Sequence, residues 1–335
     1  MEVGRRAALM GLAGFCATAF TRPDAAAAME CAQLGGTFIQ PTNAQAAWSA
    51  SDWQGLFDEL AALGLTHLFL QWTVLDRTAF FPTARYKSAK AATLPIMLNR
   101  SALAGMRAWI GLHLDTRYWN EIKQDPDHVE VYFRDRLLDL KSLLDELSPL
   151  LGAAPFAGWY VTDEIDDQTW RDAAKRAVLK RYLSDTVEEL RSRRPGSPVA
   201  ISGFTNSSSE PDAVAAFWAD ILKGTRIDLL LFQDGVGEKK LKLAEVAAYY
   251  AALRKAVGAS GARLAAVVEL FSLMPDGARL PGPVGRIQGQ LAAANGLSSF
   301  PSVAFSVPDY MSERAGRAGA TLLADFLSAQ RRCPS

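Results

Sequence analysis

The chain has 335 residues, of which 49% are hydrophobic and 21% charged, and its 36 basic side chains balance 36 acidic ones. This composition is typical of a folded globular protein and excludes a disordered or collagen-like chain. A neutral chain without a basic run is a poor candidate for binding nucleic acid or an anionic membrane surface. No internal apolar stretch approaches the roughly 20 residues of a transmembrane helix, so we expect no membrane span.

Residues 1–28 are predicted to be a signal peptide. Arg5 and Arg6 precede an apolar run at 7–20, and small residues follow at 25–28. This order is typical of export, and the adjacent arginines allow the twin-arginine route as well as the general one. A membrane anchor is the weaker alternative because the apolar run is short. We therefore expect residues 29–335 to form the mature domain, in the periplasm or outside the cell.

Removal of the signal peptide leaves two cysteines, Cys31 and Cys333, near the ends of the mature chain. In an oxidising compartment such a pair predicts a disulfide. The bridge would join the two ends of the mature domain. Two free thiols on frayed termini are the alternative.

Apolar runs alternate with amphipathic helical patterns along the mature chain. The predicted strands are 36–40, 67–72, 108–114, 156–162, 199–203, 227–232, 264–270 and 302–307. The predicted helices lie at 51–64, 99–105, 129–151, 170–190, 213–222, 243–257, 284–294 and 314–330. The first helix is expected to begin with a capping box formed by Ser51 and Gln54.

The strands are continuous apolar runs, which is typical of parallel strands buried on both faces. Eight strand–helix units in about 300 residues fit a single α/β domain, a (β/α)8 TIM barrel, which typically takes about 250 residues. The length alone would favour about two domains, but no linker or composition break divides the chain. An open doubly wound sheet is the alternative fold. It would require a glycine-rich turn after the first strand, where this chain has Gln40-Pro-Thr-Asn.

Barrel enzymes carry their active sites at the carboxyl ends of the strands. Polar and aromatic residues mark those ends here, and we predict that they bind substrate: Gln40, Gln71, Trp72, His113, Tyr160, Asp163, Asn206, Gln233, Asp234 and Tyr310. Trp72 is the preferred candidate for stacking on a sugar ring. Trp159 is expected on the outside of the barrel because it alternates with Tyr160.

Glu164 and Glu269 each follow a buried apolar stretch, at the fourth and seventh predicted strands. These strands lie on opposing sides of an eight-strand ring, so both side chains can point across the barrel mouth. Two facing carboxyl groups are what glycoside hydrolysis requires, and apolar surroundings raise the pKa of a glutamate toward the value that suits an acid. The structural alternative is a helix cap or a salt bridge at each strand end.

Other chemistries find little support. The three histidines lack a His-Glu-x-x-His pattern, no G-x-S-x-G elbow occurs, and residues 235–240 lack the spacing of a phosphate-binding loop. The acidic run at 163–167 is better explained by a helix cap beside Glu164 than by a cation site. We therefore predict no metal and no cofactor.

Short segments that span most of the mature chain are Gly36-Thr-Phe-Ile-Gln-Pro41, Leu68-Phe-Leu-Gln-Trp72, Gly158-Trp-Tyr-Val-Thr-Asp-Glu-Ile-Asp-Asp167 with Trp170, and Gln233-Asp-Gly-Val-Gly237. Together they resemble the bacterial family named domain of unknown function 4434. The resemblance implies a TIM barrel grouped with glycoside hydrolases, in exported proteins that are linked to polysaccharide.

A broader likeness to retaining glycosidases implies that Glu164 is the acid/base and Glu269 the nucleophile. Asp163 stands where many of those enzymes have Asn. This departure leaves open whether Asp163 or Asp166 also takes part in catalysis. It also leaves open whether the reaction retains or inverts the anomeric configuration. Carboxyl groups about 5 to 5.5 Å apart would predict retention, and about 6.5 to 9.5 Å inversion.

Two functions are therefore weighed. The first is an exported, monomeric glycoside hydrolase that cleaves a bacterial exopolysaccharide or another β-linked glycan. The second is a non-catalytic glycan-binding barrel that serves a polysaccharide export system, which would keep the aromatic residues without needing both glutamates.

Overall fold

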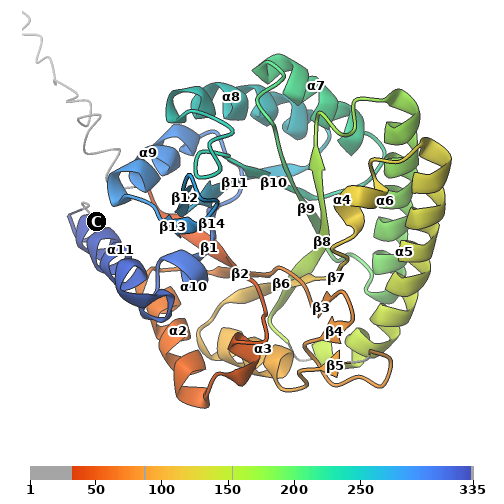
Figure 1. The fold of residues 1–335 in the computed structure, drawn as a ribbon. Helices are drawn as coiled ribbons and strands as arrows, with labels where there is room; N and C mark the ends of the chain where they lie inside the picture. Colours follow the sequence, from red (N-terminus) through yellow and green to blue (C-terminus); the bar gives the residue numbers. More distant parts are fainter. Residues whose placement is uncertain (1–31, 87, 153, 333–335) are drawn as a thin grey trace, which may run out of the picture.

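The computed structural model describes residues 32–86, 88–152 and 154–332. Within them a closed parallel barrel has the strand order β1-β14-β11-β10-β9-β8-β6-β2 (Figure 1). Its strands are β1 (Leu34–Ile39), β2 (His67–Leu70), β6 (Arg107–Gly111), β8 (Phe156–Asp166), β9 (Val199–Phe204), β10 (Leu229–Gln233), β11 (Arg263–Glu269) and β14 (Ser302–Phe305). The predicted (β/α)8 barrel is confirmed. The predicted signal peptide and the Cys31–Cys333 disulfide lie outside the described residues.

Helices surround the barrel and connect its strands (Figure 1). The main ones are α2 (Ala50–Ala62), α3 (Thr93–Leu103), α5 (Pro126–Leu147), α6 (Ala173–Arg193), α7 (Pro211–Leu222), α8 (Leu243–Ala259), α9 (Val284–Ala294) and α11 (Gly316–Gln330). The capping box of α2 is formed by Ser49 and Asp52, so the prediction of Ser51 and Gln54 was wrong by two residues. None of the helices in the described ranges is long and apolar enough to cross a membrane.

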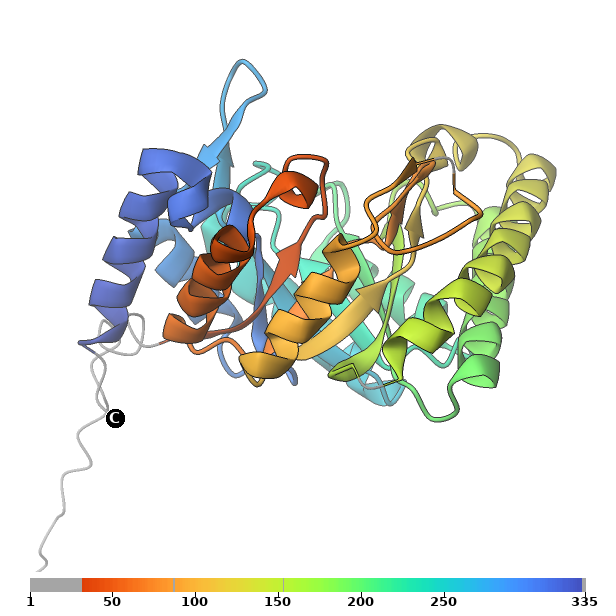
Figure 2. The same cartoon turned by 90° about the horizontal axis from the view of Figure 1, so that it is seen from below.

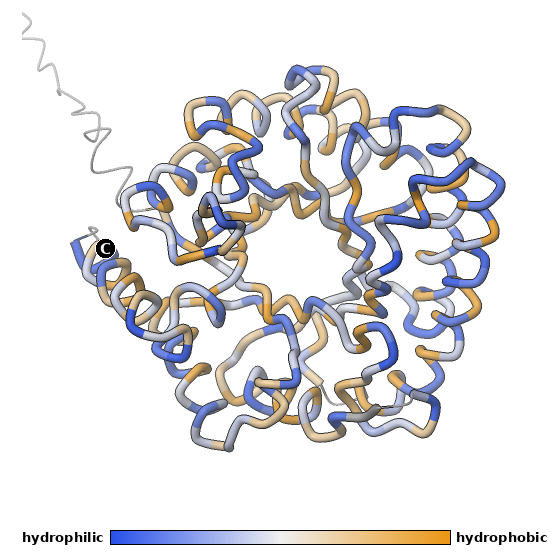
Figure 3. Tube along the Cα trace, viewed as in Figure 1, coloured by the Kyte–Doolittle hydropathy of each residue, from blue (hydrophilic) through white to orange (hydrophobic). Residues whose placement is uncertain are grey.

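Alternation along each strand divides the core into two layers. On β10, Leu229 and Leu231 belong to the cluster inside the barrel, whereas Leu230 and Phe232 belong to the larger cluster between strands and helices. Trp159 belongs to the outer cluster, as predicted. In Figure 3 apolar stretches run along the central strands, while polar residues are frequent along outer helices such as α5.

Inserted elements build up the carboxyl end of the barrel. A side sheet has the order β5-β4-β3-β7, formed by β3 (Val74–Leu75), β4 (Thr78–Ala79), β5 (Ser88–Ala89) and β7 (His113–Leu114). The hairpin of β12 (Phe271–Leu273) and β13 (Arg279–Pro281) projects beyond the barrel (Figure 2). Short helices complete this face: α4 (Tyr118–Glu121), α10 (Val307–Tyr310) and the 3-10 turns η1 (Gln45–Ala47) and η3 (Glu313–Ala315). The 3-10 turn η2 (Ser148–Leu151) instead precedes β8, at the opposite end of the barrel. The cavity described next lies among the insertions at the carboxyl end.

Candidate active site

A cavity of about 740 Å³ opens at the carboxyl end of the barrel strands. Glu164 from β8 and Glu269 from β11 both line it. Six of the residues predicted to bind substrate line it as well: Gln40, Gln71, Trp72, Asn206, Gln233 and Tyr310. The strand ends therefore bring two carboxyl groups, amides and aromatic rings from distant parts of the sequence into one space.

Glu164 reaches the cavity through an irregularity in β8. Val161 pairs with Ile201, but Ile165 pairs with Gly203, so β8 contains two more residues than β9 over this stretch. Such a bulge bends a strand and re-aims its side chains. Glu164 Oε1 accepts a hydrogen bond of 2.8 Å from Gln233 Nε2, and its carbonyl accepts one from Tyr118. Burial raises the pKa of Glu164, while the hydrogen bond from Gln233 acts in the opposite direction.

Glu269 ends β11 with a side chain that is almost enclosed, since the residue is 3% exposed. Its Oε2 accepts a 2.8 Å hydrogen bond from the main-chain N–H of Glu238, in the loop after β10. Gly237 makes this approach possible, because a Cβ there would lie 2.4 Å from Phe271 O and 2.9 Å from Glu269 Cβ. Burial and the charge of Asp234 raise the pKa of Glu269 to about 8.

Asp234 does not line the cavity, although the sequence predicted it as a substrate ligand. It is buried, and its Oδ2 accepts a 2.6 Å hydrogen bond from Gln290, which also donates to Glu269 O. Its Oδ1 accepts from the main-chain N–H of Val236. Asp234 therefore supports the loop and strand end that hold Glu269. Burial raises its own pKa.

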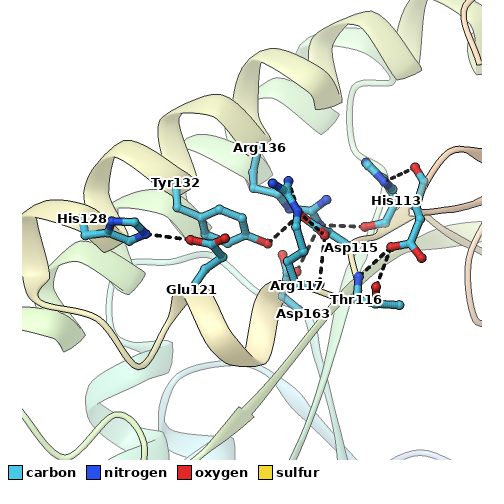
Figure 4. A network of polar contacts seen from close by, with 10 residues as sticks. His113, Asp115, Thr116, Arg117, Glu121, His128, Tyr132, Arg136 and Asp163 are labelled. Atoms are coloured by element: carbon cyan, nitrogen blue, oxygen red, sulfur yellow. Dashed lines mark hydrogen bonds and ion pairs between the residues drawn. The ribbon is translucent and has the colours of Figure 1, made fainter.

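Asp163 and His113, also predicted to bind substrate, lie behind β8 instead of in the cavity. Asp163 is 1% exposed, and it forms a 3.0 Å ion pair with Arg136 and accepts a hydrogen bond from Tyr182. Figure 4 shows Arg136 reaching from α5 toward Asp163 and the main chain of His113. A ring nitrogen of His113 contacts the carbonyl of Asp76. Successive side chains of a strand point to opposite faces, which separates Asp163 from Glu164.

Tyr160 also lies outside the set of cavity-lining residues. It belongs to the cluster inside the barrel, where its hydroxyl is 2.7 Å from Ser202 Oγ and its ring packs edge-on against Phe38. Tyr160 points inward as its position in the strand requires, but one layer below the cavity. It forms part of the floor that supports the site.

The cavity wall also contains residues that the sequence analysis did not assign to substrate: Trp119, Asp166, Phe204, Glu238, Lys240, Arg279 and Phe305. Phe204 directly follows the predicted fifth strand, so its position at a strand end could have predicted that it lines the cavity. Trp119 and Lys240 lie on a short helix and in a loop, where periodicity gives no indication of direction. Arg279 comes from the projecting hairpin and pairs with Glu238.

Hydrogen bonds to main chain and to a side chain hold polar groups of the wall in place. Trp72 donates from Nε1 to the carbonyl of Pro41 at 2.8 Å, and Asn206 donates to Asp166 at 3.1 Å. Gln71 Oε1 is buried without a hydrogen-bond partner among the described residues. Within the same residues, no group of three or more His, Cys, Asp and Glu side chains could hold a metal ion. The site is thus a carboxyl pair framed by amides and aromatic rings.

Comparison with known proteins places this site in context. The model of the family described as Domain of unknown function (DUF4434) matches residues 34–315. The uncharacterized protein YbcH of Escherichia coli (strain K12) is 32% identical over 216 residues, which are 62% of this chain and 67% of that protein.

Solved structures share the barrel. A candidate alpha-L-fucosidase from Bacteroides thetaiotaomicron VPI-5482 superposes with a TM-score of 0.76 at 17% identity, over 90% of this chain and 96% of that one. The endo-1,4-beta-D-mannanase of Thermotoga petrophila RKU-1 gives a TM-score of 0.61 at 13% identity, over 88% and 99%. PbGH5A of Prevotella bryantii B14, a glycoside hydrolase family 5 enzyme, gives 0.54 at 12% identity, over 94% and 100%. At these identities the likeness establishes the fold alone, a TIM barrel that this chain shares with these glycoside hydrolases.

Proposed function

The chain belongs to the DUF4434 family. From the residues of its cavity, we propose that it hydrolyses the glycosidic bonds of a polysaccharide. The observation that carries the proposal is the pair Glu164 and Glu269, which line one cavity from different strands without a cation paired to either among the described residues. Paired carboxyl groups on the two sides of a glycosidic bond are the usual machinery of its hydrolysis.

In the proposed reaction Glu164 donates a proton to the leaving oxygen while the carboxylate of Glu269 attacks the anomeric carbon. The glycosyl–enzyme ester is then hydrolysed by water, from which Glu164 removes a proton. Burial raises the pKa of Glu164, which favours the protonated form that a general acid needs. The hydrogen bond from the main-chain N–H of Glu238 fixes the direction of Glu269 and partly opposes the rise in its pKa that burial and Asp234 cause.

The other wall residues supply binding groups of the kind a glycan needs. Trp72 and Tyr310 offer ring faces, and Gln40 and Asn206 offer amides. Gln71 adds a further amide to the cavity lining. Together these groups support a polysaccharide substrate, either a bacterial exopolysaccharide or another β-linked glycan.

The experiment is product release from a panel of bacterial exopolysaccharides and plant β-glycans. The protein is compared with Glu164→Gln and Glu269→Gln, and with Glu130→Gln as a matched control on the outer surface. Cleavage that is lost in both cavity variants and kept in the control supports the proposal. Retention of a glycan by all four proteins on an affinity gel without any cleavage would support the non-catalytic binding barrel.

Retention of configuration is part of the same proposal. If Glu269 forms a covalent intermediate, the first product has the anomeric configuration of the substrate, which NMR of a fresh digest detects. Azide can replace a missing carboxylate, so Glu164→Ala rescued by azide should release a glycosyl azide of retained configuration. Rescue of Glu269→Ala should give the inverted azide. An inverted first product from the unaltered protein would assign Glu269 as a base instead.

We also propose that the protein acts after export, on the basis of the sequence of residues 1–28. Fusion of this segment to a reporter that is active only outside the cytoplasm tests the proposal. The reporter should be active with the native segment and inactive when Arg5, Arg6 and the apolar run are removed. Replacing only Arg5 and Arg6 by lysine separates the twin-arginine route from the general one.

A further inference from the structure

The cavity contains one ammonium group that belongs to no ion pair among the described residues. Lys240, in the loop between β10 and α8, lines the wall, and none of the ion pairs among the described residues includes it. The neighbouring arginines differ from it, because Arg279 pairs with Glu238 and Arg117 pairs with Asp115. The charge of Lys240 lowers the pKa of Glu164 and Glu269, but neither carboxyl group forms an ion pair with it. Lys240 is therefore the cation of this wall that is available to pair with an incoming anion.

Lys240 is held in place by its surroundings. Its ammonium lies 3.5 Å from the centre of the Phe204 ring, a cation–π contact. Its main-chain N–H donates to the carbonyl of Gly235 at 2.8 Å. Gly235 has a φ of 64°, in the left-handed region, which makes the tight turn of this loop possible. The neighbouring Lys239 is exposed and does not line the cavity. The position of Lys240 is thus a property of the loop.

An apolar surface stands next to this charge. Trp119 lines the cavity, is only partly buried, and has its ring centre 5.9 Å from that of Phe204. The ammonium occupies a face of Phe204, which leaves Trp119 as the ring that can stack on a sugar. A flat apolar ring beside a fixed cation matches a pyranose that carries a carboxylate.

We propose that Trp119 and Lys240 form a subsite for an acidic sugar, such as a uronic acid, within the polysaccharide substrate. The inference rests on the proposed function because the subsite belongs to the same cavity. It narrows the substrate class to glycans that carry carboxylates. The carboxylate of one bound sugar would balance the charge of one ammonium group. Among the carboxyl groups of the wall, Asp115 and Glu238 pair with arginines and Asp166 accepts a hydrogen bond from Asn206. The other two, Glu164 and Glu269, belong to the reaction centre.

Affinity electrophoresis through gels containing alginate or polygalacturonate tests the subsite. Each gel is matched with one containing the same polymer after chemical reduction of its carboxyl groups, which removes the charge and keeps the chain. All proteins carry Glu269→Gln, so that cleavage does not alter the gel. This background should bind at least one acidic polymer more tightly than its reduced form, and added salt should weaken that binding.

Lys240→Met should weaken binding to the acidic polymer by about 10- to 100-fold, the loss expected for one charge-assisted hydrogen bond. The reduced polymer should be affected far less. Lys240→Arg should restore most of the preference, and Lys239→Met should leave it unchanged. The proposal is overturned if every acidic polymer binds no better than its reduced form, or if Lys240→Met weakens both forms equally.

This result is independent of cleavage. Binding of acidic polymers that depends on Lys240, with no hydrolysis by the unaltered protein, would support the subsite and reject the proposed hydrolase. Hydrolysis of neutral glycans only, with no preference for acidic polymers, would support the hydrolase and reject the subsite.

Discussion

Strand β8 ends between two groups of charges that differ in how they are paired. Behind it, the carboxylate of Asp163 shares the guanidinium of Arg136 and the hydroxyl of Tyr182. In front of it, Glu164 accepts a hydrogen bond from the neutral amide of Gln233 and belongs to no ion pair among the described residues. Consecutive residues of one strand thus enter opposite environments. A buried charge with a full set of partners holds a structure together, whereas burial outside an ion pair raises the pKa of a carboxyl group and favours the form that can donate a proton.

The largest effect is expected at the unpaired carboxyl groups. Glu269→Gln should lower the rate of glycan cleavage by about 10³-fold or more, because the amide can neither attack nor ionise. Initial rates on the glycan found in the panel check this, with Glu130→Gln as the control. A rate within tenfold of the unaltered protein would remove Glu269 from the reaction.

The same substitution has an opposite effect on stability. The unfolded chain releases the Glu269 proton near the ordinary value of 4.5, whereas the folded protein holds it until about pH 8. The free energy of unfolding therefore falls as pH rises through this range. Glu269→Gln removes that loss, so its melting temperature should exceed that of the unaltered protein at pH 8 and approach it near pH 4. Equal differences at both pH values would contradict the raised pKa.

The next effect is on the paired group behind β8. Arg136→Met should lower the free energy of unfolding by about 3–5 kcal/mol, because it leaves the carboxylate of Asp163 buried without its cation. Adding Asp163→Leu should recover most of the loss, since the second change removes the unpaired charge. Urea unfolding of both variants measures this. A single variant as stable as the unaltered protein would show that the ion pair is dispensable.

A smaller effect is expected where the β10–α8 loop meets Glu269. Gly237→Ala forces the loop away from Phe271 and Glu269, which weakens the hydrogen bond from Glu238. We expect kcat to fall about tenfold through the displaced carboxyl group. Gly258→Ala is the control, because a Cβ at this helical glycine has nothing within 4 Å. Equal activity of the two variants would mean that the loop adapts.

The smallest effect concerns the pH profile. The reaction needs Glu164 protonated and Glu269 ionised, and burial raises the pKa of both groups, so both limbs of the bell-shaped kcat/KM profile should lie above the usual range of glutamate. Loss of the proton from Glu164 gives the alkaline limb, and ionisation of Glu269 gives the acidic limb. Asp234→Asn removes a negative charge beside Glu269, so this limb should move toward lower pH by about one unit or less. Rates measured from about pH 4 to pH 10 test the shift, and a limb that stays in place would contradict it.

The sequence predicted the barrel because continuous apolar runs and helical patterns alternate along the chain. It also placed Glu164 and Glu269 toward one mouth, since both follow such runs directly. The direction of the Asp163 side chain was harder to predict. Strict alternation places it on the opposite face of the strand from Glu164, but the sequence does not reveal the bulge in β8, because the bulge depends on pairing with β9. Asp234 was misplaced because its direction is set by Gln290, which comes from α9 and is distant in sequence.

Loop residues mark the limit of sequence-based prediction for this site. Lys240 belongs to a glycine-containing run that the sequence analysis considered only as a phosphate loop. Its place in the wall depends on Gly235, on the contact with Phe204 and on the loop's approach to Glu269. Periodicity describes strands and helices, whereas these contacts are tertiary and arise between segments that the fold brings together.

The contrast between the two sides of β8 is tested most directly by two neighbouring substitutions. Glu164→Gln and Asp163→Asn are compared for glycan cleavage and for urea unfolding. We predict that Glu164→Gln loses about 10³-fold in rate while its stability is equal to or above that of the unaltered protein. Asp163→Asn should lose stability while its folded fraction keeps activity within about tenfold. The reverse pattern, with activity lost at Asp163 and retained at Glu164, would contradict the account.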